Sequence, residues 1–238
     1  MKRISIIILA LLLVSGCSTA MKETDSDQIS EDGDQIVVMT DEDTEVNTGE
    51  IDENDVTQVI SAAEILVNLS DFKSLTEKSE IIALVRIEEI TGTNNYNPLI
   101  DKYVYPYTYG TLKVIECYKG SVSEEAPFKR MGGIISTDLY LLSEPPAARQ
   151  KLQREGNLKK YVKCYFEDDI AIESGKDYLV LMHEGDFNAL NPDEKIMDID
   201  FLQAGLREYD RESNCVLNNI TGEWEDLNTL IAQLEASK

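Results

Sequence analysis

The 238-residue sequence has a single histidine, His183, and its four cysteines form no close pair of the C-x-x-C type. Zinc sites need several strong ligands at short spacings, so we expect no metal centre and no cofactor. A Ser-His-Asp or Cys-His site would have to use His183, but no G-x-S-x-G motif occurs. His183 is therefore interpreted as a surface or capping residue at the end of a strand.

Basic residues are few: 22 lysines and arginines stand against 45 acidic residues, for a formal net charge of −23. Nucleic-acid binding depends on basic patches that neutralise phosphates, so a nucleic-acid partner is not expected. One region has the opposite sign. Its basic residues are Arg149, Lys151, Arg154, Lys159, Lys160 and Lys163. The region is interpreted as a solvated helix face, and contact with anionic lipids or wall polymers is the alternative.

The sequence also lacks an apolar run that could span a bilayer, because the longest, from Ile4 to Val14, is only about eleven residues. Lys2 and Arg3 precede this run, and Ser15-Gly16-Cys17 follows it, an order typical of a secretory signal. It resembles the lipobox of bacterial lipoproteins, which implies cleavage before Cys17 and lipid, such as palmitate, on that cysteine. We therefore expect a signal over residues 1–16 and an anchor at the outer face of the cytoplasmic membrane of a Gram-positive bacterium. An ordinary cleaved secretory signal is the alternative.

Residues 17–54 lack aromatic side chains and contain one base, Lys22, among many acids. Such a segment cannot bury enough apolar surface to offset the entropy of ordering, so it is predicted to be a disordered acidic tether. Residues 55–238 remain as one folded domain, within the usual size of a single domain.

Periodicity in this domain predicts helices towards both ends and strands between them. A first helix is expected to start at Asp55 and run to Val67, and Thr221 is expected to cap a last helix that buries Trp224. Shorter helices are predicted after Ser70 and over 145–156, and a loop over 92–98. Strands are predicted at 81–87, 103–118, 128–135, 161–166, 177–183, 206–210 and 214–217.

These elements predict a mainly β fold with flanking helices, arranged as a barrel of five or six strands. S-E-I-I-A-L-V-R-I at 79–87, T-L-K-V-I-E-C-Y-K-G at 111–120 and S-G-K-D-Y-L-V-L-M at 174–182 support this fold. With the Gly132-Gly133 strand, they resemble the OB-fold barrel of tissue-inhibitor-of-metalloproteinase and netrin-type modules, as in exported Gram-positive proteins. The animal inhibitors act through a cysteine at the start of the barrel. This chain has none there, so the resemblance does not extend to protease inhibition.

Four tyrosines, Tyr103, Tyr105, Tyr107 and Tyr109, occupy every second position, on one face of an extended strand. Their rigid, amphipathic rings predict a contact surface for a sugar or a peptide. The alternative is an aromatic ladder that stabilises the barrel.

Other reactive residues have simpler interpretations. Cys117, Cys164 and Cys215 are read as buried, reduced cysteines, although export would permit one disulfide. The acids at 167–169 and the pair Asp198 and Asp200 are read as solvated turns and strand edges, and no catalytic pair is assigned.

These observations together predict a membrane-anchored, extracytoplasmic binding or interaction module of unknown ligand, whose partner is an envelope protein or a wall polymer. The alternative is a wall-active hydrolase that uses carboxylates, which would need a concave site with two carboxyl groups. A structural lipoprotein in an envelope complex is a third hypothesis.

Overall fold

The computed structural model describes residues 51–62 and 67–236, which belong to one compact unit that starts at Met39. The expected signal, Cys17 and most of the expected tether lie outside the described residues. Glu53–Asp55, near the start of the described residues, form a short 3-10 helix, η2. None of the described helices has the length and apolar composition needed to cross a membrane.

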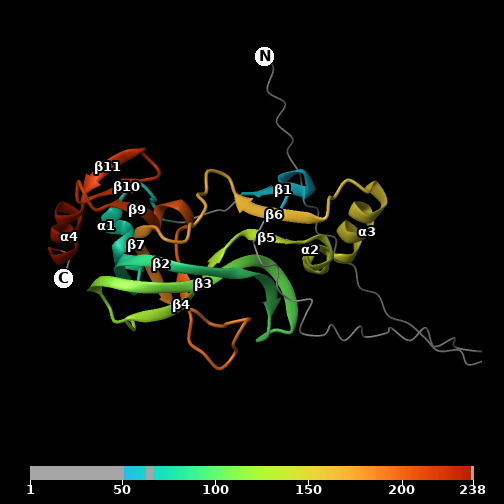
Figure 1. The fold of residues 1–238 in the computed structure, drawn as a ribbon, viewed down its shortest axis with the longest axis horizontal. Coiled ribbons are helices and arrows are strands. Elements are labelled where there is room, and N and C mark those ends of the chain that lie inside the picture. The colour runs from blue at the N-terminus through green and yellow to red at the C-terminus, as the bar shows by residue number, and fades with distance from the viewer. Residues whose placement is uncertain (1–50, 63–66, 237–238) are drawn as a thin grey trace, which may run out of the picture. The chain divides into compact units, whose positions relative to one another are not determined.

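The larger of two sheets contains eight strands in the order β11-β10-β9-β7-β2-β3-β4-β8 (Figure 1). β8 pairs with β4 in parallel and with β7 in antiparallel orientation, so the hydrogen-bonded ladder returns to the middle of the sheet. The strands are β2 Ile81–Asn97, β3 Lys102–Lys119, β4 Glu125–Met131, β7 Asp177–Glu184, β8 Met197–Ile199, β9 Leu206–Asp210, β10 Cys215–Asn218 and β11 Glu223–Asp226.

The smaller sheet has three strands in the order β1-β6-β5, where β1 pairs with β6 in parallel. Its strands are β1 Val56–Ser61, β5 Gly133–Ser136 and β6 Tyr161–Phe166. Helices α2 and α3 lie next to it, and α1 and α4 lie together beside the larger sheet (Figure 1). The helices are α1 Phe72–Lys78, α2 Thr137–Ser143, α3 Pro146–Glu155 and α4 Leu227–Glu235, with a second 3-10 turn, η3, at Leu202–Ala204.

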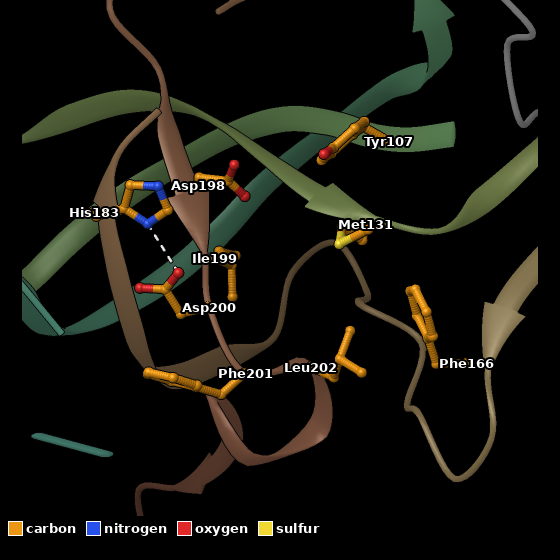
Figure 2. Close-up of a pocket in the computed structure, with 9 residues that line it drawn as sticks. All are labelled: Tyr107, Met131, Phe166, His183, Asp198, Ile199, Asp200, Phe201 and Leu202. Atoms are coloured by element: carbon orange, nitrogen blue, oxygen red, sulfur yellow. Dashed lines mark hydrogen bonds and ion pairs between the residues drawn. The ribbon is translucent and has the colours of Figure 1, made fainter. Parts of the chain in front are cut away.

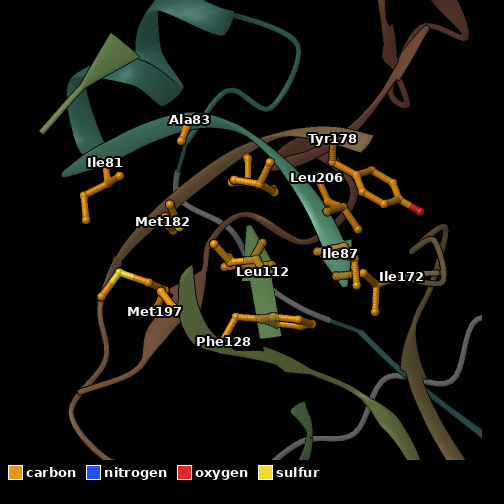
Figure 3. Close-up of a cluster of buried hydrophobic side chains, with 14 residues drawn as sticks. Ile81, Ala83, Ile87, Leu112, Phe128, Ile172, Tyr178, Met182, Met197 and Leu206 are labelled. Atoms are coloured by element: carbon orange, nitrogen blue, oxygen red, sulfur yellow. The ribbon is translucent and has the colours of Figure 1, made fainter. Parts of the chain in front are cut away.

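Both faces of the larger sheet are buried over its central strands. On one face, side chains of β2, β3, β4 and β7 meet around Leu112 and Phe128 (Figure 3). On the other, Ile82 and Leu84 pack with side chains of α1 and α4. Residues 81–85 form an unbroken apolar run because this part of the strand is covered on both faces, so none of its side chains faces solvent.

The mainly β class with helices is confirmed, as are the predicted strands at 81–87, 103–118, 161–166, 177–183, 206–210 and 214–217. The number of strands is higher than predicted, with eleven among the described residues. Helix α1 is confirmed after Ser70, and α3 ends at Gly156, whose φ of +62° is the left-handed conformation that glycine favours.

The first predicted helix is wrong over 56–61, because Val56–Ser61 form strand β1 instead, and residues 63–66 of that prediction lie outside the described residues. Val56, Thr57, Val59 and Ile60 are β-branched, and pairing with β6 satisfies the backbone of this segment. The spacing of apolar residues from Val56 to Val67 fits a helix, but it carries no information about pairing with the distant strand β6.

Three further boundaries differ from prediction. The expected loop at 92–98 is mostly strand, where Asn95 is buried and its Nδ2 donates to the Leu139 carbonyl at 2.8 Å. The expected strand at 128–135 divides at Gly132 into β4 and β5, which belong to different sheets. The last helix starts at Leu227 after an Asp226 cap, and Trp224 lies on β11 and is exposed.

Candidate functional site

A cavity of about 400 Å³ opens beside β8 and the turn that follows it (Figure 2). Its walls are mostly apolar and come from three separate parts of the chain: Met131, Phe166, and Ile199, Phe201 and Leu202. Its polar groups are Tyr107, His183, Asp198 and Asp200. A cavity of this size, apolar with a few convergent polar groups, is typical of a small-ligand site.

Strand register places the polar groups side by side. In β8, Met197 and Ile199 face the core, so Asp198 and Asp200 share the opposite face. Asp198 lies opposite Lys129 of β4 on one side and His183 of β7 on the other. Lys129 in turn lies opposite Tyr109 of β3. One lateral row across four strands therefore places two polar groups of the cavity, His183 and Asp198, in line with Lys129 and Tyr109.

The turn after β8 fixes the end of the cavity. Phe201 and Leu202 both have left-handed backbones, with φ of 56° and 50°, which non-glycine residues rarely adopt. Gly205 lies against the backbone of Asp200 so closely that a Cβ there would overlap the Asp200 carbonyl oxygen. This tight packing holds Asp200, Phe201 and Leu202 at the cavity wall.

His183 and Asp200 form a direct pair, with Nδ1 of the imidazole 2.8 Å from Oδ1 of the carboxylate (Figure 2). Because a carboxylate only accepts, Nδ1 carries the proton and Nε2 is left for another partner. Burial raises the pKa of the Asp200 carboxyl to about 6, and His183 opposes that rise. Asp200 is therefore ionised at neutral pH but at a free-energy cost.

Asp198 has a different partner, the buried ammonium of Lys129, at 3.3 Å from its Oδ2. That ammonium also lies over the ring of Phe187, 3.6 Å from its centroid, and 5.1 Å from the centroid of Tyr107. Burial raises the pKa of the Asp198 carboxyl, while the nearby Lys129 lowers it. Lys129 thus neutralises one of the two carboxylates that line the cavity.

No protein-family model matches this chain, and no curated protein matches it.

The cavity's carboxylates and aromatic walls suit a cation or a hydrogen-bond donor attached to an apolar body. No cluster of His, Cys, Asp or Glu in the described parts of the chain could hold a metal ion.

Three of the four tyrosines of the predicted contact surface pack against other side chains or are buried, and the fourth lines the cavity. Tyr109 is only 1% exposed, so it cannot take part in a surface. Tyr103 stacks on Tyr96 and Tyr105 on Phe166, with ring centroids 5.4 and 5.0 Å apart. Tyr107 is half-buried and lines the cavity, so it is the member of the set that belongs to this candidate site.

Sequence reasoning missed most of this site. The sequence predicts Asp198 and Asp200 to be solvated, but their side chains are only 17% and 20% exposed, and both line the cavity. His183 lies at the end of its strand with a side chain that is 38% exposed, as the sequence predicts, and it lines the same cavity. The signal that could have found the two aspartates is the D-x-D spacing of Asp198 and Asp200, which places two acids on one face of a strand.

The remaining predicted features are placed as follows. All three described cysteines are free, and Cys164 is buried as expected, whereas Cys117 on β3 is exposed and Cys215 on β10 is half-buried. Helix α3 of the basic region buries no residue, in keeping with a solvated face. Asp169 is not solvated, because it forms a buried ion pair with Arg130.

Proposed function

We propose that this chain is an exported, lipid-anchored binding protein. In this proposal the cavity beside His183 takes a small apolar ligand with a cationic or hydrogen-bond-donating head. The observation that carries the proposal is the imbalance of charge in an apolar cavity. Two carboxylates, Asp198 and Asp200, line it, and the buried cation Lys129 contacts only the first of them.

The anchor is proposed from the sequence motif that ends at Cys17, and residues 17–54 are proposed as the tether. Lipid on this cysteine would hold the domain at the outer face of the cytoplasmic membrane, where ligands from the envelope or medium reach it. Two or more acyl chains are needed for a stable anchor.

We also propose that the larger sheet contains an OB-like barrel, which would keep the resemblance to netrin-type modules. Two observations support it. The pairing runs from β7 through β2, β3, β4 and β8 back to β7. All five of these strands contribute side chains to the single core cluster around Phe128 and Leu112.

The binding proposal is tested by calorimetric titration of the full chain carrying Cys17→Ser. Three probes share one body and differ in the head: 3-phenylpropylamine, 3-phenylpropan-1-ol and 3-phenylpropanoate. We expect the amine to bind about tenfold more tightly than the alcohol, as one added charged hydrogen bond would give. The propanoate should not bind, because its charge would meet the two carboxylates.

Asp200→Asn should remove the advantage of the amine over the alcohol. Asp193→Asn is the matched control, since it removes an exposed aspartate close by in sequence and should leave that advantage intact. Equal affinity of the three probes, or equal effects of the two variants, would contradict the proposal.

A wall-active hydrolase is the second candidate function, because Asp198 and Asp200 line one concave site and burial raises the pKa of both carboxyls. A carboxyl with a pKa of about 6 suits a general acid. Release of reducing sugar from purified cell wall, reduced more than about a hundredfold in Asp200→Asn, would favour this function. Equal release by Asp200→Asn and the unmodified chain would exclude Asp200 as its acid.

A further inference from the structure

A second cavity, of about 490 Å³, lies between the smaller sheet and β2, β3 and β4, beneath the segment 169–172. Gly132 and Gly133, where the chain passes from one sheet to the other, form part of its wall. Most of the exposed lining is apolar and includes Ile90, Ile134 and Ile172. Among residues in the described ranges, this cavity shares only Met131 with the one beside His183.

The charged groups that line this cavity have a net positive charge, whereas the protein as a whole is negatively charged. Arg130 and Lys163 line the cavity with one acid, Asp169, so the cations are in excess. The chain as a whole has a formal net charge of −23. A cationic excess inside a strongly acidic protein favours an anionic ligand at that place.

Two buried polar atoms of the lining have no hydrogen-bond partner within the described part of the structure. They are Nε of Arg130, whose side chain is 6% exposed, and Oγ1 of Thr93, a residue that is 1% exposed. Arg130 contacts Asp169 through Nη2, so Nε remains as a donor. An unpartnered buried donor costs about 1–3 kcal/mol, so such groups call for an acceptor.

Gly133 explains how Thr93 comes to line the cavity. Its φ is +139°, and a Cβ at this position would lie 2.6 Å from Oγ1 of both Thr93 and Thr108. Thr108 uses its hydroxyl to donate to the Gly132 carbonyl at 2.8 Å. The Thr93 hydroxyl has no such acceptor among the residues that the structure describes, so it can donate to a ligand.

We propose that this cavity is a second binding site, which takes an apolar ligand that ends in a carboxylate. The carboxylate accepts from Nε of Arg130 and from the hydroxyl of Thr93, and Lys163 adds the positive charge that Asp169 does not cancel. The apolar part of the ligand contacts the isoleucines. This site is independent of the cavity beside His183, and its ligand has the opposite charge.

The test is calorimetric titration of the full chain carrying Cys17→Ser with decanoate, methyl decanoate and decylamine. Decanoate is expected to bind, methyl decanoate about tenfold more weakly, and decylamine more weakly still at this site. Binding of the ester as tight as that of the acid, or no binding of decanoate, would overturn the proposal and leave Arg130 and Thr93 as structural groups.

Thr93→Val is the decisive variant, because it keeps the shape of the side chain and removes only the hydroxyl. It should weaken decanoate binding about tenfold without lowering stability, since the lost hydroxyl has no partner in the described structure. Thr93→Ser keeps the hydroxyl and should bind decanoate as the unmodified residue does. An equal affinity in Thr93→Val and Thr93→Ser would overturn the proposal.

Asp200→Asn separates the two cavities. Decanoate affinity should be unchanged in this variant if decanoate occupies the Arg130 cavity. A change of decanoate affinity in Asp200→Asn but not in Thr93→Val would place decanoate beside His183 and refute the second site. Failure of 3-phenylpropylamine to bind would contradict only the proposal for the cavity beside His183.

Discussion

Replacement of Asp200 by Asn is expected to stabilise the protein at neutral pH. The Asp200 side chain is 20% exposed, and burial raises the pKa of its carboxyl from an ordinary 3.8 to about 6. When folding raises the pKa of a carboxyl, the ionised form of that carboxyl stabilises the folded state less than the protonated form does. Asparagine cannot ionise, and its amide oxygen can still accept from Nδ1 of His183.

The pH window follows from the two pKa values of Asp200. Below pH 3.8 the carboxyl is protonated in both folded and unfolded states, so it has no effect on the free energy of unfolding. Between pH 3.8 and about 6 the folded protein holds more protons, so stability falls as the pH rises. Each pKa unit corresponds to about 1.4 kcal/mol, so the full penalty above pH 6 is roughly 3 kcal/mol.

Urea unfolding of the unmodified chain, Asp200→Asn and Asp193→Asn over about pH 4 to 8 checks this prediction. Asp193→Asn corrects for the loss of one negative charge from a strongly acidic chain. The difference between the two variants should be close to zero near pH 4 and grow to roughly 3 kcal/mol above pH 6. A difference that does not change with pH, or an Asp200→Asn variant less stable than the control at neutral pH, would refute the reasoning.

Three further predictions concern stability and location. Gly133→Ala should lower the free energy of unfolding by more than about 2 kcal/mol, because of its positive φ and the close hydroxyls, whereas Gly156→Ala, with open space around it, should lower it by about 1 kcal/mol; urea unfolding compares them. Arg207→Ala should lower it by about 3 kcal/mol, since Arg207 is 0% exposed and its Nη1 lies 2.7 Å from Glu225; similar unfolding midpoints for the variant and the unmodified chain would contradict this. Labelled palmitate should attach to the full chain in a Gram-positive host and not to Cys17→Ser, and label on both would exclude Cys17 as its site.

Local sequence patterns predict an element well where its structure does not depend on a partner far away in the sequence. Helix α3 follows from its prolines and from Gly156, and β6 from the strand-forming residues of its sequence Y-V-K-C-Y-F. The segment 56–61 shows the limit of such patterns. Its apolar spacing fits a helix, but the β6 strand about 100 residues later provides the backbone partners that make it a strand.

Asparagines illustrate the same limit. Asn94 and Asn95 are typical loop residues, yet both are buried in β2. The amide of Asn95 reaches a carbonyl of α2, a helix that the sequence analysis did not predict. A polar residue inside a strand is recognisable only when its distant partner is known.

The candidate site could be predicted only in part, for a similar reason. The spacing of Asp198 and Asp200 indicates a shared strand face. The lateral row through Lys129 and His183 depends on the register of β4, β8 and β7, and β8 is only three residues long. No local pattern fixes the register of so short a strand.

The pocket beside His183 can be observed directly, because His183 is the only histidine in the chain. Its imidazole nitrogen and proton signals, recorded by NMR on tag-free full chain carrying Cys17→Ser, report on this cavity alone. The account predicts a proton on Nδ1 and a shift of these signals as 3-phenylpropylamine is added, saturating at the affinity found by calorimetry. Imidazole signals that do not change while the amine binds would contradict the account, because the ligand would then occupy another place.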